Sequence, residues 1–250
     1  MKESFREKLR CGKSQIGTII TLPCPETAEI LSDAGFDFLF IDTEHAPLSI
    51  QDVQHILQTV QHKCPCIVRA PLHNEIWIKR ILDTGPDGIV VPLVNSAEEA
   101  ARAVSFCRYP PEGKRSVGIA RAHRYGEKFS EYIDSANSAV AVIVQAEHID
   151  AVRNIDSIVT VKGIDGIFIG PYDLSGSMGM TGKVNTPEVR EAVRKVHTTC
   201  LNAGIPAGIF GIDSDAGARY IGQKYSFIAA GMDILFLGEK AREIIEKLNK

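Results

Sequence analysis

The chain has 250 residues, of which 44% are hydrophobic and 24% charged, with a formal net charge of -3 at pH 7; this length suits one (β/α)8 barrel or two smaller domains. The slightly acidic balance and the absence of a run of Lys and Arg exclude a basic surface, so we expect no nucleic-acid partner. The apolar runs are too short to span a bilayer and the six Cys form no disulfide-dense pattern, so we expect no membrane contact and a cytoplasmic protein with reduced thiols.

In chain order, a charged N-terminus without the apolar core of a signal peptide is followed by short runs of Val, Ile, Leu and Phe that alternate with amphipathic stretches. Such alternation is typical of βα units around a parallel sheet. The eight runs predict strands at Ile16–Thr21, Phe36–Ile41, Cys66–Ala70, Gly88–Pro92, Val140–Gln145, Gly166–Ile169, Ile205–Phe210 and Phe227–Ala230. This count, and the lack of a GxGxxG motif after the first strand, favour an α/β fold of the TIM (β/α)8 barrel type over a doubly wound sheet. We expect one domain over residues 1–250.

Helix boundary signals fall between these strands. Ser49 and Asn74 are N-cap residues, and Pro187 opens a helix that stops at Gly204. One connection, residues 109–138, is much longer than an ordinary loop. Connections of that length in compact domains predict a lid or an interface element.

In a (β/α)8 barrel the chemistry is carried by the loops at the carboxyl ends of the strands. Four predicted strands run there into charged or amide side chains. These are Asp42, Glu44 and His45 after the second strand, Arg69 at the end of the third, Gln145 and Glu147 after the fifth, and Asp173 after the sixth. Because all these ends meet at one rim, we expect a functional site there.

Glu147 and Asp173 follow consecutive strands, so their carboxylates can meet above the barrel. Two carboxylates suit a hard divalent cation such as Mg²⁺ or Mn²⁺. They could instead cap helices, pair with Arg, or act as a general acid–base couple without metal. No Lys lies within a predicted strand, which argues against Schiff-base chemistry and makes the metal the preferred interpretation.

Arg69 and His45 are the other two side chains that suit chemistry at this rim. A guanidinium at a strand end suits a carboxylate or an enolate oxygen, unless it simply pairs with Glu147 or Asp42. An imidazole just beyond a strand can act as a general acid or base near neutral pH. Asp83, at the end of the helix that follows the third strand, could orient His45.

At these positions the sequence resembles the HpcH/HpaI aldolase family. The likeness covers essentially the whole chain, through GFDFLFIDTEHAP, IVRAP, VPLVNSAEEA, YPPEGKRSVG, VQAE and GIFIGPYDLSGSMG. The resemblance implies a barrel of the phosphoenolpyruvate/pyruvate-domain type. It also implies a class II aldehyde-lyase that reversibly cleaves a 4-hydroxy-2-oxo acid to pyruvate and an aldehyde. The segment GIARAHRYGEK looks more like members that act on sugar-derived acids, of the 2-dehydro-3-deoxyglucarate type.

The resemblance also implies roles for individual residues. Glu147 and Asp173 match the two carboxylates that bind a divalent cation (Mg²⁺, Mn²⁺ or Co²⁺). Arg69 matches the residue that binds the oxo group and stabilises the enolate. His45 matches the catalytic His that removes the proton of the 4-hydroxyl, and Asp83 matches the carboxylate paired with it.

Further positions around the site follow from the same resemblance. Asp42 and Gln145 match polar residues of the site, and the backbone near Pro171, Tyr172 and Asp173 matches the turn that receives the substrate carboxylate. Family members are typically hexamers, built as dimers of trimers, with a C-terminal helix exchanged between subunits. The tail EKAREIIEKLNK is the expected counterpart of that helix.

Two other functions remain open at the level of sequence. Related barrels with a carboxylate-bound Mg²⁺ cleave malyl- or citramalyl-CoA thioesters, and others use phosphoenolpyruvate. A CoA substrate would need a basic channel, for which the sequence shows no cluster. The other alternative is a barrel that binds a small acid without catalysis, which the presence of His45, Arg69 and both carboxylates disfavours.

Overall fold

The computed structural model describes residues 4–249, so residues 1–3 and 250 of the predicted domain and tail lie outside it. Eight parallel strands pair in the order of the sequence and close into a barrel. Their bounds are Gln15–Ile20 (β1), Phe38–Asp42 (β2), Cys66–Arg69 (β3), Gly88–Val91 (β4), Ala141–Ala146 (β5), Gly166–Ile169 (β6), Ala207–Gly211 (β7) and Phe227–Met232 (β8). The predicted strands differ from these bounds by no more than two residues, and the predicted TIM barrel is confirmed.

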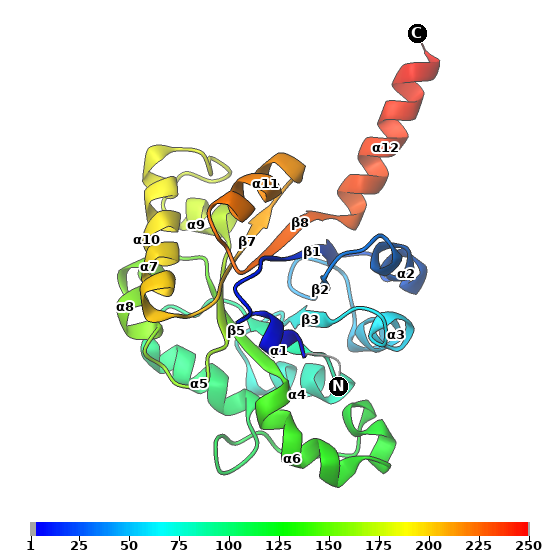
Figure 1. Cartoon of the computed structure of the whole chain (residues 1–250), viewed down its shortest axis with the longest axis vertical. Helices are drawn as coiled ribbons and strands as arrows, with labels where there is room; N and C mark the ends of the chain where they lie inside the picture. Colours follow the sequence, from blue (N-terminus) through cyan, green and yellow to red (C-terminus); the bar gives the residue numbers. More distant parts are fainter. Residues whose placement is uncertain (1–3, 250) are drawn as a thin grey trace.

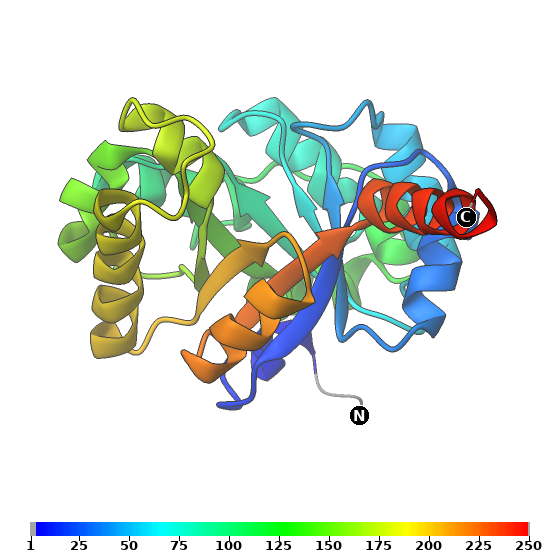
Figure 2. The same ribbon diagram turned by 90° about the horizontal axis from the view of Figure 1, so that it is seen from above.

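Helices surround the barrel on its outside (Figures 1 and 2). Between the strands lie α2 (Pro25–Asp33), α3 (Ile50–Val60), α4 (Glu75–Thr84), α5 (Ala97–Cys107), α7 (Ile149–Arg153), α8 (Ile155–Ile158), α9 (Pro171–Ser177), α10 (Pro187–Ala203) and α11 (Ser214–Gly222). Because helices cover the outer face and side chains fill the inner one, strands β2 to β6 are buried along their whole length. This explains why their sequences are nearly continuous apolar runs.

Local capping fixes where the helices start and stop. The Ser49 side chain accepts the N–H of Asp52, whose side chain accepts the N–H of Ser49, so α3 begins with a capping box. The Asn74 side chain caps the first turn of α4, and Gly85 ends that helix in the left-handed conformation. The two N-caps fix where α3 and α4 begin, and Gly85 turns the chain at the end of α4 toward the amino end of β4.

An aromatic column fills the barrel interior from its amino end upward. Phe5, on α1 (Phe5–Lys8), lies 5.3 Å from Phe38, and Phe38 lies 6.3 Å from Phe227. The column continues through Phe168, 5.9 Å from Phe227, to Phe40, 5.1 Å from Phe168. None of these rings is more than 2% exposed. The short helix α1 therefore closes the amino end of the barrel as a plug.

Asp165, on the loop before β6, ties this plug to the barrel. Its carboxylate accepts hydrogen bonds from Arg6 Nε at 2.6 Å, Arg10 Nη2 at 3.0 Å and Arg108 Nη2 at 2.8 Å. The Asp165 side chain is fully buried and that of Arg108 is 2% exposed. A buried carboxylate is tolerated here because both of its oxygens are hydrogen-bonded and cations surround it.

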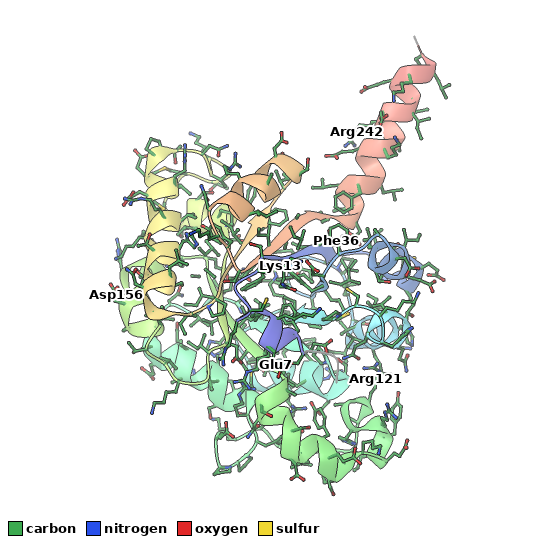
Figure 3. All side chains as sticks on the ribbon, viewed as in Figure 1. Glu7, Lys13, Phe36, Arg121, Asp156 and Arg242 are labelled. Atoms are coloured by element: carbon green, nitrogen blue, oxygen red, sulfur yellow. The ribbon has the colours of Figure 1, made fainter. Side chains whose placement is uncertain are left out.

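The long connection after α5 lies at the amino end of the strands. It contains η1 (Arg121–Gly126) and α6 (Phe129–Ala139), which lies at the lower edge of Figure 1. Its Arg121 donates to the Thr84 carbonyl at 2.5 Å; Figure 3 labels this side chain. Thr84 ends α4, which runs from the carboxyl end of β3 back to the start of β4. The connection therefore does not cover the chain's own rim, and its role as a lid or an interface element stays a prediction.

The last helix, α12 (Asp233–Leu248), leaves the barrel after β8 and projects away from it (Figures 1 and 3, with Arg242 labelled along it). Five of its large apolar side chains are between 45% and 76% exposed: Ile234, Leu237, Ile244, Ile245 and Leu248. Their spacing lays them along one side of the helix. Of the helices between residues 4 and 249, α12 included, none has the length and apolarity to cross a bilayer.

We expect Asp165→Ala to lower the free energy of unfolding by about 3–5 kcal/mol, because it leaves the buried Arg108 guanidinium without its carboxylate. Urea denaturation followed by circular dichroism measures the change. Asp156→Ala, at an exposed position on α8 that Figure 3 labels, is the matched control and should cost less than about 0.5 kcal/mol. Equal losses in the two variants would contradict a stabilising role for the Asp165 cluster.

Candidate functional site

The carboxyl ends of the strands form one rim of the barrel, and most of the predicted site residues lie on it. Asp42 ends β2 and Arg69 ends β3, and the two are partners in the strand register. Glu147 directly follows β5, and Asp173 lies in the first turn of α9, directly after β6. Parallel pairing therefore brings side chains that are far apart in sequence to one end of the barrel, as predicted.

Asp42 and Arg69 form a bidentate ion pair at this rim. Arg69 Nε donates to Asp42 Oδ1 at 2.9 Å and Nη2 donates to Oδ2 at 2.7 Å. Burial would raise the pKa of Asp42, but the hydrogen bonds and charge of Arg69 outweigh it and hold this pKa below its ordinary value. Burial would likewise lower the pKa of Arg69, and Asp42 reverses that effect. Both groups are therefore charged at neutral pH.

Further contacts fix the orientation of Arg69. Its carbonyl oxygen accepts hydrogen bonds from Thr43, from the N–H at 3.3 Å and from Oγ1 at 2.5 Å. The guanidinium carbon lies 5.5 Å from the ring centre of Phe40, at the upper end of the aromatic column. Nη1 is the one guanidinium nitrogen that donates no hydrogen bond to any residue within 4–249. The site therefore holds a rigid cation with one nitrogen available to a ligand.

Glu147 is the buried carboxylate of the site, at 3% exposure. Its Oε1 accepts the N–H of Leu93 at 2.7 Å, and its Oε2 accepts a hydrogen bond from the Gln145 amide. Leu93 has a φ of 54°, in the left-handed region that is uncommon for Leu. Burial, together with the charge of Asp173, raises the pKa of Glu147, and the two hydrogen bonds oppose this only in part.

The turn from β6 into α9 leaves room above Glu147. A side chain at Gly170 would bring its Cβ to 3.0 Å from Glu147 Cβ, closer than most real contacts, so glycine keeps this approach open. Pro171 starts α9, and the N–H groups of Tyr172 and Asp173 in its first turn have no acceptor within the helix. Pro171 and Tyr172 also line a groove of about 960 Å³ between α10 and α11.

The residues fit a divalent cation that takes most of its ligands from outside the protein. No cluster of three His, Cys, Asp or Glu side chains suited to a metal occurs between residues 4 and 249, so a closed protein cage is absent from that range. Glu147 and Asp173 offer two carboxylates, and the buried Gln145 Oε1 has no hydrogen-bond partner among residues 4–249. Oxygen donors of this kind suit hard cations. Burial is the main cause of the raised pKa of Glu147, and the charge of Asp173 adds to it.

Glu44 is a rim residue for which the sequence analysis predicts no role. It lies on the loop after β2, beside His45, whose side chain is 59% exposed. Glu44 Oε2 lies 3.8 Å from His45 Nε2 and 3.3 Å from Arg69 Nε. Burial and the neighbouring carboxylates raise the pKa of Glu44 to about 8, although the charge of Arg69 opposes them. The DTEH segment placed Glu44 on the rim, but nothing in the sequence indicated these contacts.

The predicted pairing of Asp83 with His45 does not occur within this chain. Asp83 Oδ1 accepts a hydrogen bond from Arg115 Nη2 at 2.9 Å. Asp83 lies in the last turn of α4, at the amino end of the strands, whereas His45 follows the carboxyl end of β2. The barrel itself therefore separates the two side chains.

A family profile, curated proteins and solved structures that resemble this chain carry related descriptions. The family profile described as HpcH/HpaI aldolase/citrate lyase matches residues 15–238. A hydroxypyruvate/pyruvate aldolase of Cupriavidus necator is 39% identical over 243 residues, covering 96% of this chain and 90% of that protein. A 4-hydroxy-2-oxo-heptane-1,7-dioate aldolase of Salmonella dublin is 39% identical over 247 residues, covering 98% and 94%. The crystal structure of an HpcH/HpaI aldolase/citrate lyase family protein of Burkholderia cenocepacia J2315 is 32% identical, with a TM-score of 0.94 over 98% of both chains.

In the presence of EDTA, we expect Glu44→Gln to become progressively more stable than the wild-type protein as pH rises from about 5 to about 8. The folded wild-type protein keeps the Glu44 proton up to a pKa of about 8, whereas the unfolded chain loses it near its ordinary value of 4.5. The folded state then binds more protons, so wild-type stability falls across this window. Gln has no such proton, and urea denaturation at several pH values measures the difference.

Glu98→Gln, at an exposed position on α5, is the control for this titration. Its stability difference from the wild-type protein should not change with pH. A difference for Glu44→Gln that is equally flat would contradict the raised pKa of Glu44.

Proposed function

We propose a reaction for this chain from one premise: it belongs to the HpcH/HpaI aldolase/citrate lyase family. The chain is an aldolase, since relatives that are 39% identical over nearly its whole length carry that name. The reaction we propose is the reversible cleavage of a 4-hydroxy-2-oxo acid to pyruvate and an aldehyde. The observation that carries this proposal is the fixed Arg69 guanidinium on the same rim as Glu147 and Asp173.

The proposed reaction makes two demands on a protein. Breaking the bond between C3 and C4 leaves an enolate, whose negative charge lies largely on the 2-oxo oxygen, so that oxygen needs cations or hydrogen-bond donors. The proton of the 4-hydroxyl must leave as the aldehyde carbonyl forms, so that oxygen needs a base, and one proton must then reach C3 to convert the enolate into pyruvate. A site for this reaction therefore combines positive charge at one end with a proton acceptor at the other.

A divalent cation (Mg²⁺, Mn²⁺ or Co²⁺) held by Glu147 and Asp173 would supply Lewis acidity to the 2-oxo acid. Arg69 donates through Nη1 to the oxo oxygen as negative charge develops there. Because Asp42 already holds this guanidinium in place, it needs no reorganisation during the reaction. Gln145 keeps the Glu147 carboxylate oriented by donating to Oε2.

The remaining assignments concern the orientation of the substrate, through its carboxylate and its 4-hydroxyl group. The N–H groups of Tyr172 and Asp173, in the first turn of α9, are the donors proposed for the substrate carboxylate. His45, half-exposed on the loop after β2, is the base proposed for the proton of the 4-hydroxyl. The aldehyde portion then leaves on the side of His45.

The purified protein should release pyruvate from 4-hydroxy-2-oxo acids, as measured by coupling to lactate dehydrogenase. EDTA should lower the rate at least about 100-fold, and Mn²⁺, Co²⁺ or Mg²⁺ should restore it. Glu147→Gln should reproduce the loss even in excess metal, because an amide oxygen does not offset the charge of a cation. A rate that EDTA leaves unchanged would contradict the metal-dependent mechanism.

Three further measurements sharpen this assay. Arg69→Ala should lower kcat by roughly 10²–10³ with a smaller effect on Mn²⁺ affinity, since it removes a donor to the enolate. Malyl-type CoA thioesters serve as rival substrates, and their cleavage in place of pyruvate release would favour a CoA lyase. A panel of aldehydes condensed with pyruvate, with the products identified by mass, gives the aldehyde partner.

We also propose that the chain forms a homo-hexamer, a dimer of trimers, in which α12 is exchanged between subunits. The projecting helix supports this, since its apolar side chains lie largely uncovered: Leu237 is 67%, Ile245 58% and Leu248 76% exposed. An exposed apolar stripe of this kind is typical of an interface. A second copy of the chain is the partner that the exchange requires.

The double variant Leu237→Glu/Ile245→Glu should have a lower mass than the wild-type protein in solution, because charges would then lie within the proposed interface. Size-exclusion chromatography with light scattering measures the mass. Glu246→Ala, at an exposed polar position of the same helix, is the control and should leave the mass unchanged. A wild-type protein that elutes as a monomer would refute the exchange of α12.

A further inference from the structure

Glu44 is a largely buried carboxyl group that lies between the two side chains with complementary roles in the proposed reaction. Its Oε2 lies 3.3 Å from Arg69 Nε and 3.8 Å from His45 Nε2. Its side chain is 13% exposed, and Oε2 is buried without a hydrogen bond to any residue within 4–249. A buried polar oxygen in this state is unfavourable for folding and calls for an explanation.

The backbone of Glu44 is tied to Arg69 as well. Asp42 Oδ1 accepts the N–H of Glu44 at 3.0 Å and that of His45 at 3.4 Å. The same oxygen accepts the hydrogen bond from Arg69 Nε. Asp42 thus fixes the path of the loop relative to the guanidinium. It leaves the His45 side chain without a support of its own, and Glu44 is the one carboxylate within 4.0 Å of that ring among residues 4–249.

We propose that Glu44 is a positioning residue of the reaction, whose carboxyl group sets the separation between the His45 imidazole and the Arg69 guanidinium. This inference rests on the proposed function, in which Arg69 acts at the 2-oxo oxygen and His45 at the 4-hydroxyl. The two oxygens belong to one substrate and lie on carbons two bonds apart, so the base and the cation must keep a fixed separation. A misplacement of about 1 Å is enough to cost roughly 10²-fold in rate.

The test is a double-mutant cycle measured by pyruvate release. Glu44→Leu should lower kcat about 10- to 100-fold, while KM for the 2-oxo acid changes less than about threefold, because only the alignment of the reacting groups is lost. In a His45→Ala background the same substitution should lower the residual kcat less than about twofold, since the ring that Glu44 positions is gone. Glu44→Gln, which keeps a polar group at the same distance, should restore part of the loss.

Glu98→Leu, an exposed glutamate of α5, is the matched control and should keep the wild-type kcat. The melting temperature and Mn²⁺ affinity of Glu44→Leu show whether this variant is folded. If it does not fold, Glu44→Gln takes its place in the double-mutant cycle. We expect a smaller loss of kcat for Glu44→Gln, which again disappears in the His45→Ala background. Equal fractional losses with and without His45, or a wild-type kcat in Glu44→Leu, would overturn this inference and leave the aldolase function standing. A wild-type protein that releases no pyruvate would refute the proposed function, and this inference with it.

Discussion

The ion pair between Asp42 and Arg69 is the interaction on which the candidate site depends. The two residues are register partners at the ends of β2 and β3, so the pairing of these two strands is enough to bring their side chains into contact. They are 3% and 7% exposed, and each buried charge is tolerated only because the other is present. The same carboxylate accepts the N–H groups of Glu44 and His45, so it also sets the path of the loop. One pair therefore fixes a cation and the backbone that carries Glu44 and His45.

The barrel divides stability and chemistry between its two ends. At the amino end, α1 and the arginines around Asp165 close the interior, and the long connection after α5 packs against the end of α4. The aromatic column leads from this plug to Phe40, whose ring lies beneath the Arg69 guanidinium. The polar rim therefore lies directly above the apolar barrel interior, which excludes water. Charges held in such surroundings interact more strongly than they would in water.

The sequence predicted the barrel and its rim because both follow from one physical constraint. Strands buried on both faces are apolar throughout, so the first polar residue after each run marks the end of a strand. Asp83 lies at the opposite rim from His45, since the helix that carries it returns to the start of the next strand. The left-handed Leu93 has no sequence signal, because Leu rarely adopts that conformation. The contacts of Glu44 arise from packing between segments far apart in sequence, which a single sequence does not reveal.

The charges on the rim support the proposed divalent cation. The Arg69 guanidinium offsets the charge of Asp42, and three carboxyl groups remain at Glu44, Glu147 and Asp173. Burial and their mutual repulsion raise the pKa values of Glu44 and Glu147, which shows that the protein alone compensates these charges poorly. A divalent cation at Glu147 and Asp173 would offset two of these charges. In the proposed reaction the 2-oxo acid carries its own negative carboxylate, which the acidic rim would repel without that cation, so binding and chemistry would both depend on the same ion.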